Sequence, residues 1–104
     1  VEALATVDRE QLRELMKDAP TLTFQPGETI LQQGALGDVF YFLLDGEVEV
    51  STRQGNHAER LIDRLGPGRY FGEMALLGNK RRSATVRAAG DGPVRVLELD
   101  AAAF

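Results

Sequence analysis

Turn-forming residues divide most of this sequence into short segments, and their spacing limits the folds available to the chain. From residue 21 to residue 100, turns rich in glycine recur at roughly eight- to twelve-residue intervals. Segment 47–50 alternates between polar and apolar residues, with its valines on one face and its glutamates on the other. We therefore predict a mainly β fold, an antiparallel β-barrel of jelly-roll type over about residues 21–100.

Three features of this pattern carry specific expectations. Residues 40–44 are apolar on both faces, which predicts a central strand. Asp45-Gly46 follows directly and is the strongest short hairpin signal in the sequence, so we expect the strands on either side of it to pair. In the last segment the apolar residues change parity between Val96 and Leu97, which predicts either a bulge or a strand buried on both faces.

Helical sequence occurs at three places. We predict an N-terminal helix over about residues 8–18, with Asp8 as its N-cap. Residues 73–77 form a short helical stretch between two strands, which is unusual within a β fold and therefore needs a functional reason. A run of alanines predicts the beginning of a C-terminal helix from residue 101, cut short by the end of the sequence. Together these elements predict a single domain over residues 1–104.

Composition narrows the classes of function. The net charge of -4 argues against a nucleic-acid-binding surface, which normally has a basic bias. The longest apolar run, residues 39–44, is far too short to span a bilayer, so we expect no membrane contact by this chain. The sequence has no cysteine, which fits a cytoplasmic protein without disulfides.

The residue inventory also argues against an enzyme. His57 is the only histidine and falls in a predicted turn, so a metal-binding barrel would lack its ligand set. Ser51 and Ser83 have no histidine and carboxylate partners in the pattern of a catalytic triad. We therefore expect no catalytic residues, no metal and no cofactor.

The segment that contains the short internal helix combines groups suited to a phosphate and a sugar. Gly72 precedes the helix and allows a ligand to approach the backbone closely. Arg82 supplies a planar set of donors that matches two phosphate oxygens. Ser83 and Ala84 are small, so their backbone N–H groups can reach the same anion. Glu73 is a poor phosphate ligand and a good acceptor for a sugar hydroxyl.

This segment resembles the phosphate-binding cassette of cyclic-nucleotide-binding domains, as in the regulatory subunits of cAMP-dependent protein kinase, catabolite activator protein and cyclic-nucleotide-gated channels. The family pattern is Phe-Gly-Glu, an apolar helical turn, and then arginine followed by small residues. The resemblance implies that Arg82 binds the cyclic phosphate and that Glu73 binds the ribose 2′-hydroxyl. It implies a ligand, cAMP and possibly cGMP, and these ligand-binding residues: Phe71, Gly72, Glu73, Met74, Arg82, Ser83, Ala84 and Thr85.

The resemblance covers nearly the whole chain and implies a regulatory role. A module of this kind senses a cyclic nucleotide and passes the signal to a covalently attached effector domain by a conformational change. The sequence departs from the family in one place, because many members have proline where this chain has Arg81. The family's lid helix would follow Phe104, so we expect the chain to be a piece of a longer protein. The alternative is a domain that has kept this fold, lost ligand binding and serves in protein interaction.

Overall fold

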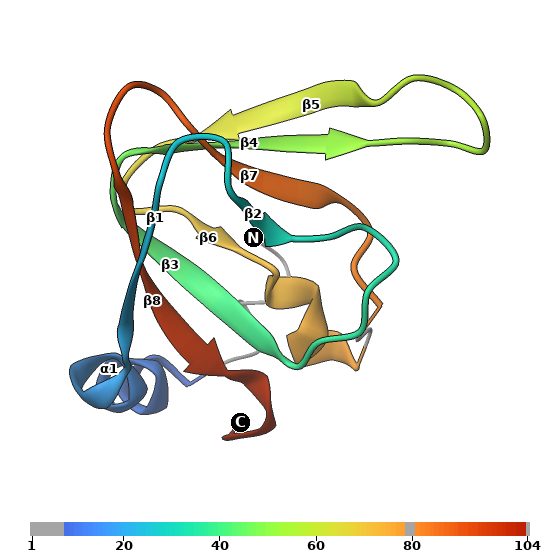
Figure 1. Ribbon diagram of the computed structural model, residues 1–104. Helices are drawn as coiled ribbons and strands as arrows, with labels where there is room; N and C mark the ends of the chain where they lie inside the picture. The colour runs from blue at the N-terminus through green and yellow to red at the C-terminus, as the bar shows by residue number, and fades with distance from the viewer. Residues whose placement is uncertain (1–7, 79–80, 104) are drawn as a thin grey trace.

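The computed structural model describes residues 8–78 and 81–103 (Figure 1). One α-helix, eight strands and two 3-10 helices follow one another along this part of the chain. In chain order they are α1 (Arg9–Asp18), β1 (Thr21–Phe24), β2 (Thr29–Leu31), β3 (Val39–Asp45), β4 (Glu47–Thr52), β5 (Arg60–Leu65), β6 (Tyr70–Phe71), η2 (Glu73–Leu77), β7 (Thr85–Ala89), β8 (Val94–Asp100) and η3 (Ala101–Ala103).

The strands form two antiparallel sheets of four strands each, in the orders β1-β8-β3-β6 and β2-β7-β4-β5. The mainly β fold and the antiparallel pairing are thus confirmed. The prediction of a barrel holds only roughly. Within the described ranges no strand pairing joins one sheet to the other, so the sheets pack face to face as an open sandwich.

The predicted hairpin at Asp45-Gly46 is wrong. β3 and β4 lie on either side of this turn, yet they belong to different sheets. Gly46 has a φ of 91°, and a Cβ at this position would lie 2.9 Å from the carbonyl oxygen of Pro93. The glycine is therefore needed where the chain crosses between the sheets beside the loop that joins β7 to β8. Local turn chemistry identified the bend, but it could not distinguish a hairpin from a crossover.

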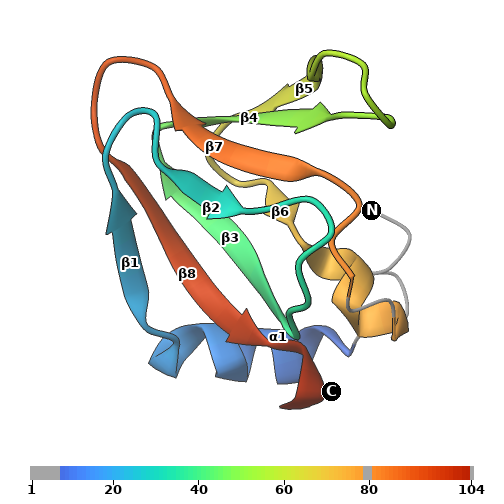
Figure 2. The ribbon, with the colours of Figure 1, turned by 45° about the vertical axis from the view of Figure 1, so that its right-hand side comes forward.

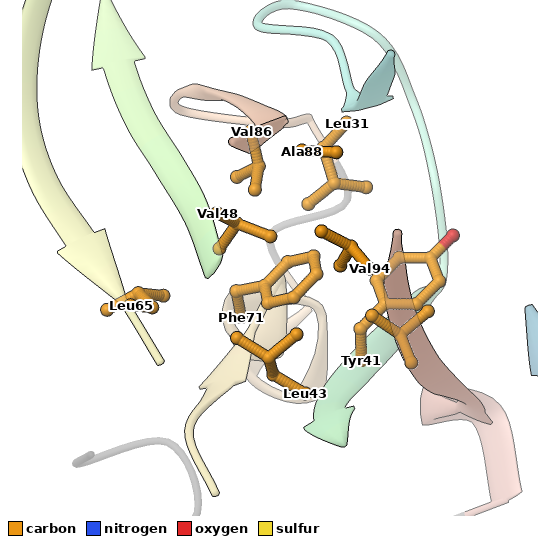
Figure 3. Close-up of a cluster of buried hydrophobic side chains, with 10 residues drawn as sticks. Leu31, Tyr41, Leu43, Val48, Leu65, Phe71, Val86, Ala88 and Val94 are labelled. Carbon is orange, nitrogen blue, oxygen red and sulfur yellow. The ribbon is translucent and has the colours of Figure 1, made fainter. Parts of the chain in front are cut away.

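Two buried clusters hold the layers together. The larger lies between the sheets and contains ten buried residues (Figure 3): Leu31, Tyr41, Leu43, Val48, Leu65, Phe71, Val86, Ala88, Val94 and Val96. The smaller lies on the other side of β3 and β8 and contains Phe40, Ala75, Leu99 and Ala101. The central position predicted for residues 40–44 is confirmed, because β3 lies between β8 and β6.

β8 is buried on both faces. Of the two predicted alternatives, a bulge or a strand buried on both faces, the second is confirmed. Val94 and Val96 belong to the cluster between the sheets, whereas Leu99 belongs to the smaller cluster. The register shift in this part of the sheet lies in β3 instead, between Leu43 and Asp45. The change of parity along the sequence therefore reflects a strand that contacts two cores.

The three helices meet at the smaller cluster. Asp8 caps α1 by accepting a hydrogen bond of 3.0 Å from the backbone N–H of Glu10, which confirms the predicted cap. The apolar side of α1 packs partly buried against the smaller cluster, where η2 and η3 also contribute residues. Figure 2 shows α1 crossing below the ends of β1 and β8. In the part of the chain that the structure describes, no helix is long and apolar enough to cross a bilayer.

Candidate functional site

A cavity of about 240 Å³ lies beside η2, where the two sheets and the segment before β7 meet. Its walls come from β6 and η2, from residues 81–84, and from the strands β2, β4, β5 and β7. Seven of the eight residues that the sequence predicts as ligand-binding line it: Phe71, Gly72, Glu73, Met74, Arg82, Ser83 and Ala84. The structure thus brings the two halves of the predicted motif to one place.

Gly72 shapes the entrance to η2. Its φ of 77° lies in the left-handed region, which favours glycine. A Cβ there would lie 3.1 Å from Leu31 Cδ1 and 3.2 Å from Arg82 Nη1. The carbonyl oxygen of Gly72 accepts a hydrogen bond of 3.3 Å from the N–H of Ala75, which closes a 3-10 turn. The predicted internal helix is therefore present as a 3-10 helix, which is the tighter form that proteins use in short pieces.

Arg82 is a buried cation, and only 9% of the residue is exposed. Its Nη1 donates to the carbonyl oxygen of Gly72 at 3.2 Å, and its Nη2 donates to that of Val39 at 2.7 Å. No carboxylate of residues 8–78 or 81–103 lies within 4.0 Å of its guanidinium nitrogens. The backbone carbonyls orient the group but leave its charge uncompensated. A buried charge of this kind is costly unless an anion joins it.

The backbone around Arg82 is fixed by the loop between β2 and β3. The N–H of Arg82 donates to the carbonyl oxygen of Ala35, and the N–H of Gly34 donates to that of Arg82, both at 2.8 Å. Leu36 and Arg81 form a further bridge between these segments. Arg81 also lines the cavity, but it is exposed, and its side chain donates to the carbonyl oxygen of Gly34 at 2.7 Å.

Gly37 lies against the guanidinium of Arg82, although its place in the sequence predicts only a turn former. Its φ is not in the left-handed region, but a Cβ there would lie 2.6 Å from Arg82 Nη2 and 3.0 Å from Cζ. Any side chain at this position would displace the guanidinium. The sequence signal for this contact is the presence of two glycines within residues 34–37. Gly34 has a φ of 85°, which favours glycine, whereas Gly37 has no such backbone requirement.

Glu73 lies at the first position of η2 and lines the same cavity as Arg82. Its Oε2 atom is buried and has no hydrogen-bond partner in the part of the chain that the structure describes. Leaving a buried carboxylate oxygen without a donor costs free energy. The arrangement suits a ligand that brings a hydroxyl donor to this oxygen.

Thr85 is the one predicted residue that does not line the cavity. It is only 1% exposed, and its hydroxyl oxygen accepts hydrogen bonds from the backbone N–H of Gln33 at 3.0 Å and from Gln32 Nε2 at 3.4 Å. The wall also contains residues outside the predicted set. Arg69, Tyr70, Arg81 and Val86 adjoin the motif or lie within it, whereas the others come from strands far from it in sequence: Leu31, Val50, Ile62, Asp63 and Leu65.

The wall residue Phe71 is supported by Tyr41, which does not itself line the cavity. Phe71 stacks on Tyr41 with their centroids 5.2 Å apart and their planes at 21°. The Tyr41 hydroxyl donates to Glu98 Oε2 at 3.3 Å. Burial, followed by the negative charge of Glu98, raises the pKa of Tyr41 to about 12, although the charge of Arg82 opposes this shift. Tyr41 is uncharged at neutral pH, as a tyrosine with its ordinary pKa would be, so its hydroxyl does not neutralise Arg82.

Among the described residues there is no group of three or more histidine, cysteine or acidic side chains arranged to hold a metal ion. His57 lies between β4 and β5 and is exposed, and it is not part of the cavity wall. Five charged residues line the cavity. Of these, Asp63, Arg69 and Arg81 are exposed, whereas Arg82 is buried and Glu73 is partly buried.

A two-sheet sandwich with a short helix inserted before β7 defines the class of fold. A comparison with family models identifies the family. Residues 21–104, most of the chain, match the family model of the cyclic nucleotide-binding domain. The chain belongs to the cyclic nucleotide-binding domain family.

Two relatives of the chain are named as regulatory subunits of a protein kinase. The chain is 36% identical to the cAMP-dependent protein kinase regulatory subunit of Mycosarcoma maydis, over 99% of this chain and 19% of the relative. It is also 36% identical to the subunit of the same name from Dictyostelium discoideum, over 100% of this chain and 32% of the relative. The chain thus spans about a fifth to a third of the length of these relatives.

A solved structure supports the same family. The regulatory domain of Toxoplasma gondii PKA, crystallised with cAMP, superposes with a TM-score of 0.82 at 30% identity, over 100% of this chain and 40% of that chain. The similarity extends over all of the present domain, including the segment that carries Glu73 and Arg82.

Proposed function

We propose that this chain is a non-enzymatic regulatory module that binds a cyclic nucleotide in the cavity beside η2, with cAMP preferred over cGMP. One observation carries the proposal. Arg82 is a buried cation without an acidic partner in the described chain, and Glu73 has a buried oxygen without a donor, and both line one cavity. A ribose with a cyclic phosphate supplies both missing groups, an anion and a hydroxyl.

The proposed contacts follow from these positions. The phosphate lies against the guanidinium of Arg82 and accepts hydrogen bonds from the backbone N–H groups of Glu73, Ser83 and Ala84. The ribose 2′-hydroxyl donates to the carboxylate of Glu73. Gly72 and Met74 complete the edge of the cavity beside η2. Phe71 supports this edge from below through its stack on Tyr41. Thr85 contributes through the backbone, since its hydroxyl is engaged by Gln33.

The preference for cAMP rests on the relatives and on Ser83. Both kinase subunits named above are described as cAMP-dependent. Ser83 is exposed and lines the cavity, so its hydroxyl can donate to the phosphate or accept from the 2-amino group of guanine. We propose that the phosphate contact dominates, which leaves no additional interaction that favours cGMP.

The conformational change on binding would be transmitted to attached segments through the smaller buried cluster. Ala75 of η2 is buried there beside Ala101, and Leu12 and Leu15 of α1 pack against the same residues. A ligand that prefers one position of η2 shifts the population toward the matching arrangement of α1 and of the segment from Ala101. We propose that a covalently attached effector domain responds to this shift and that the protein is cytoplasmic.

Calorimetric titration of the ligand-free protein with cAMP and cGMP tests the proposal. We expect saturable binding of one nucleotide per chain, with the smaller dissociation constant for cAMP. A smaller constant for cGMP would contradict the proposed selectivity. Binding of neither nucleotide would contradict the function itself and favour the alternative of a protein-interaction domain that has lost its ligand.

The proposed role of Glu73 predicts discrimination at the ribose. Replacing cAMP by its 2′-deoxy analogue removes the hydroxyl and leaves the Glu73 oxygen buried without a donor. Binding should weaken by about 1–3 kcal/mol. In the Glu73→Gln variant the difference between the two nucleotides should become smaller, because the neutral amide accepts a weaker hydrogen bond. Equal affinity of the unmodified protein for cAMP and the deoxy analogue would refute this role.

A further inference from the structure

The segment that lines the cavity leaves its sheet at a defined residue. β4 and β7 pair in one continuous register from Glu47 opposite Ala89 to Ser51 opposite Thr85. Two more residues in the same register would place Arg53 opposite Ser83. The chain does not continue this pairing, and residues 81–84 turn toward the cavity.

The backbone of Arg53 is occupied by a side chain from another segment. Gln33 lies after β2 and uses both ends of its amide. Its Oε1 accepts from the N–H of Arg53 at 2.8 Å, and its Nε2 donates to the carbonyl oxygen of Arg53 at 3.0 Å. The amide therefore takes the place that the peptide groups of a neighbouring strand would fill. The backbone N–H of Gln33 donates to the buried hydroxyl of Thr85, the first residue of β7.

We propose that Gln33 is a positioning residue that ends the pairing of β4 with β7 at Thr85 and so keeps the N–H of Ser83 available for an anionic ligand. The proposal rests on the proposed function, because it assigns that N–H to the cyclic phosphate. As long as both polar groups of the Arg53 backbone bind Gln33, neither can pair with Ser83. No hydrogen bond of the Ser83 N–H to the described part of the chain competes with this use.

The alternative arrangement is physically accessible. Without the Gln33 amide, Arg53 presents an unpaired N–H and C=O at the end of β4, and Ser83 is the next residue in register. Pairing would satisfy those groups and extend the sheet. It would also draw the N–H of Ser83 out of the cavity. The binding-competent form would then be only a fraction of the protein, and the apparent affinity would fall by that fraction.

Gln33→Met tests this inference, because methionine has a similar length and neither donates to nor accepts from Arg53 as the amide does. We expect the N–H of Ser83 in the ligand-free variant to exchange with solvent more slowly than in the unmodified protein. If about nine tenths of the variant adopts the paired form, exchange slows about tenfold and the cAMP dissociation constant rises about tenfold. Hydrogen exchange followed by NMR and calorimetric titration measure these two quantities.

Two further variants make the test specific. Gln33→Glu keeps the acceptor for the Arg53 N–H and loses the donor to its carbonyl, so both effects should be intermediate. Gln54→Met is the matched control, because Gln54 follows Arg53 in the connection between β4 and β5, is exposed, and its side chain forms no hydrogen bond to the described chain. Its exchange rate at Ser83 and its affinity should equal those of the unmodified protein.

The sign of the exchange effect separates positioning from simple structural support. A merely structural Gln33 would loosen the region when replaced. The N–H of Arg53 would then exchange faster, and that of Ser83 would stay as unprotected as in the unmodified protein; that result would overturn the inference. An unchanged cAMP affinity in Gln33→Met would overturn it as well. Failure of the unmodified protein to bind cAMP would instead refute the proposed function, while slower exchange at Ser83 would still support the role of Gln33 in the strand pairing.

Discussion

Replacing Arg82 by alanine is expected to weaken cAMP binding by about 2–4 kcal/mol, which corresponds to roughly 30- to 800-fold in the dissociation constant. The guanidinium is buried, oriented by the carbonyl oxygens of Gly72 and Val39, and not neutralised by a carboxylate of the described chain. Its removal leaves the phosphate of the ligand in a partly desolvated site without its opposite charge. Calorimetric titration measures the change directly.

The neighbouring arginine provides the control. Arg81 carries the same charge and also lines the cavity, but it is exposed, and its side chain donates to the carbonyl oxygen of Gly34. Arg81→Ala should therefore change affinity much less than Arg82→Ala, even though both variants lose one positive charge. Arg82→Lys should also bind weakly, because a single ammonium group cannot replace the planar fork. Affinity within a factor of about two after Arg82→Ala would contradict the assignment.

Phe71→Ala is expected to lower the free energy of unfolding by about 3–5 kcal/mol. The Phe71 side chain is 4% exposed, stacks on Tyr41 and belongs to the larger cluster between the sheets. Figure 3 shows its ring in the middle of that cluster, between Val48 and Leu43. Deleting the ring would leave a cavity under the binding site. Denaturant unfolding of the ligand-free protein measures the loss.

Phe71→Leu separates packing from ligand contact. Leucine keeps much of the apolar volume, so this variant should lose considerably less stability than Phe71→Ala and should retain most of the affinity for cAMP. A large loss of affinity in a stably folded Phe71→Leu protein would indicate that the ring itself contacts the ligand. A small stability change in Phe71→Ala would contradict the central place of this residue in the core.

The sequence predicted the elements of the fold better than the connections between them. Alternation and turn spacing predict the β segments other than the two-residue strand β6, and the apolar segment 40–44 correctly indicates a central strand. Asp45-Gly46 was interpreted as a hairpin because glycine with positive φ serves both a hairpin and a crossover. The choice between them depends on the close approach of Pro93, a contact that no local pattern reports. Local patterns also do not indicate which strands pair at the edges of the sheets, so the sequence predicts a barrel where the structure has two open sheets.

The candidate site was predictable to the extent that it is contiguous in sequence. The segment that contains Glu73 and Arg82 forms one side of the cavity, as the motif indicated. The groups that orient this segment come from elsewhere in the chain. Gly37 makes room for the guanidinium and Gln33 occupies the end of β4, and each acts through a contact across many intervening residues. Spacing along the chain carries no information on such contacts.

The pairing of β1 with β8 has a consequence for how the domain forms. Thr21 lies opposite Leu97, so the first strand of the sandwich cannot pair until the last strand is available. β2 likewise pairs with β7, and β3 pairs with β8. Closing such long loops costs entropy before any contact compensates for it, and folding dominated by distant pairings occurs on the order of milliseconds to seconds. During synthesis on the ribosome, neither sheet can be completed until nearly the whole sequence has emerged.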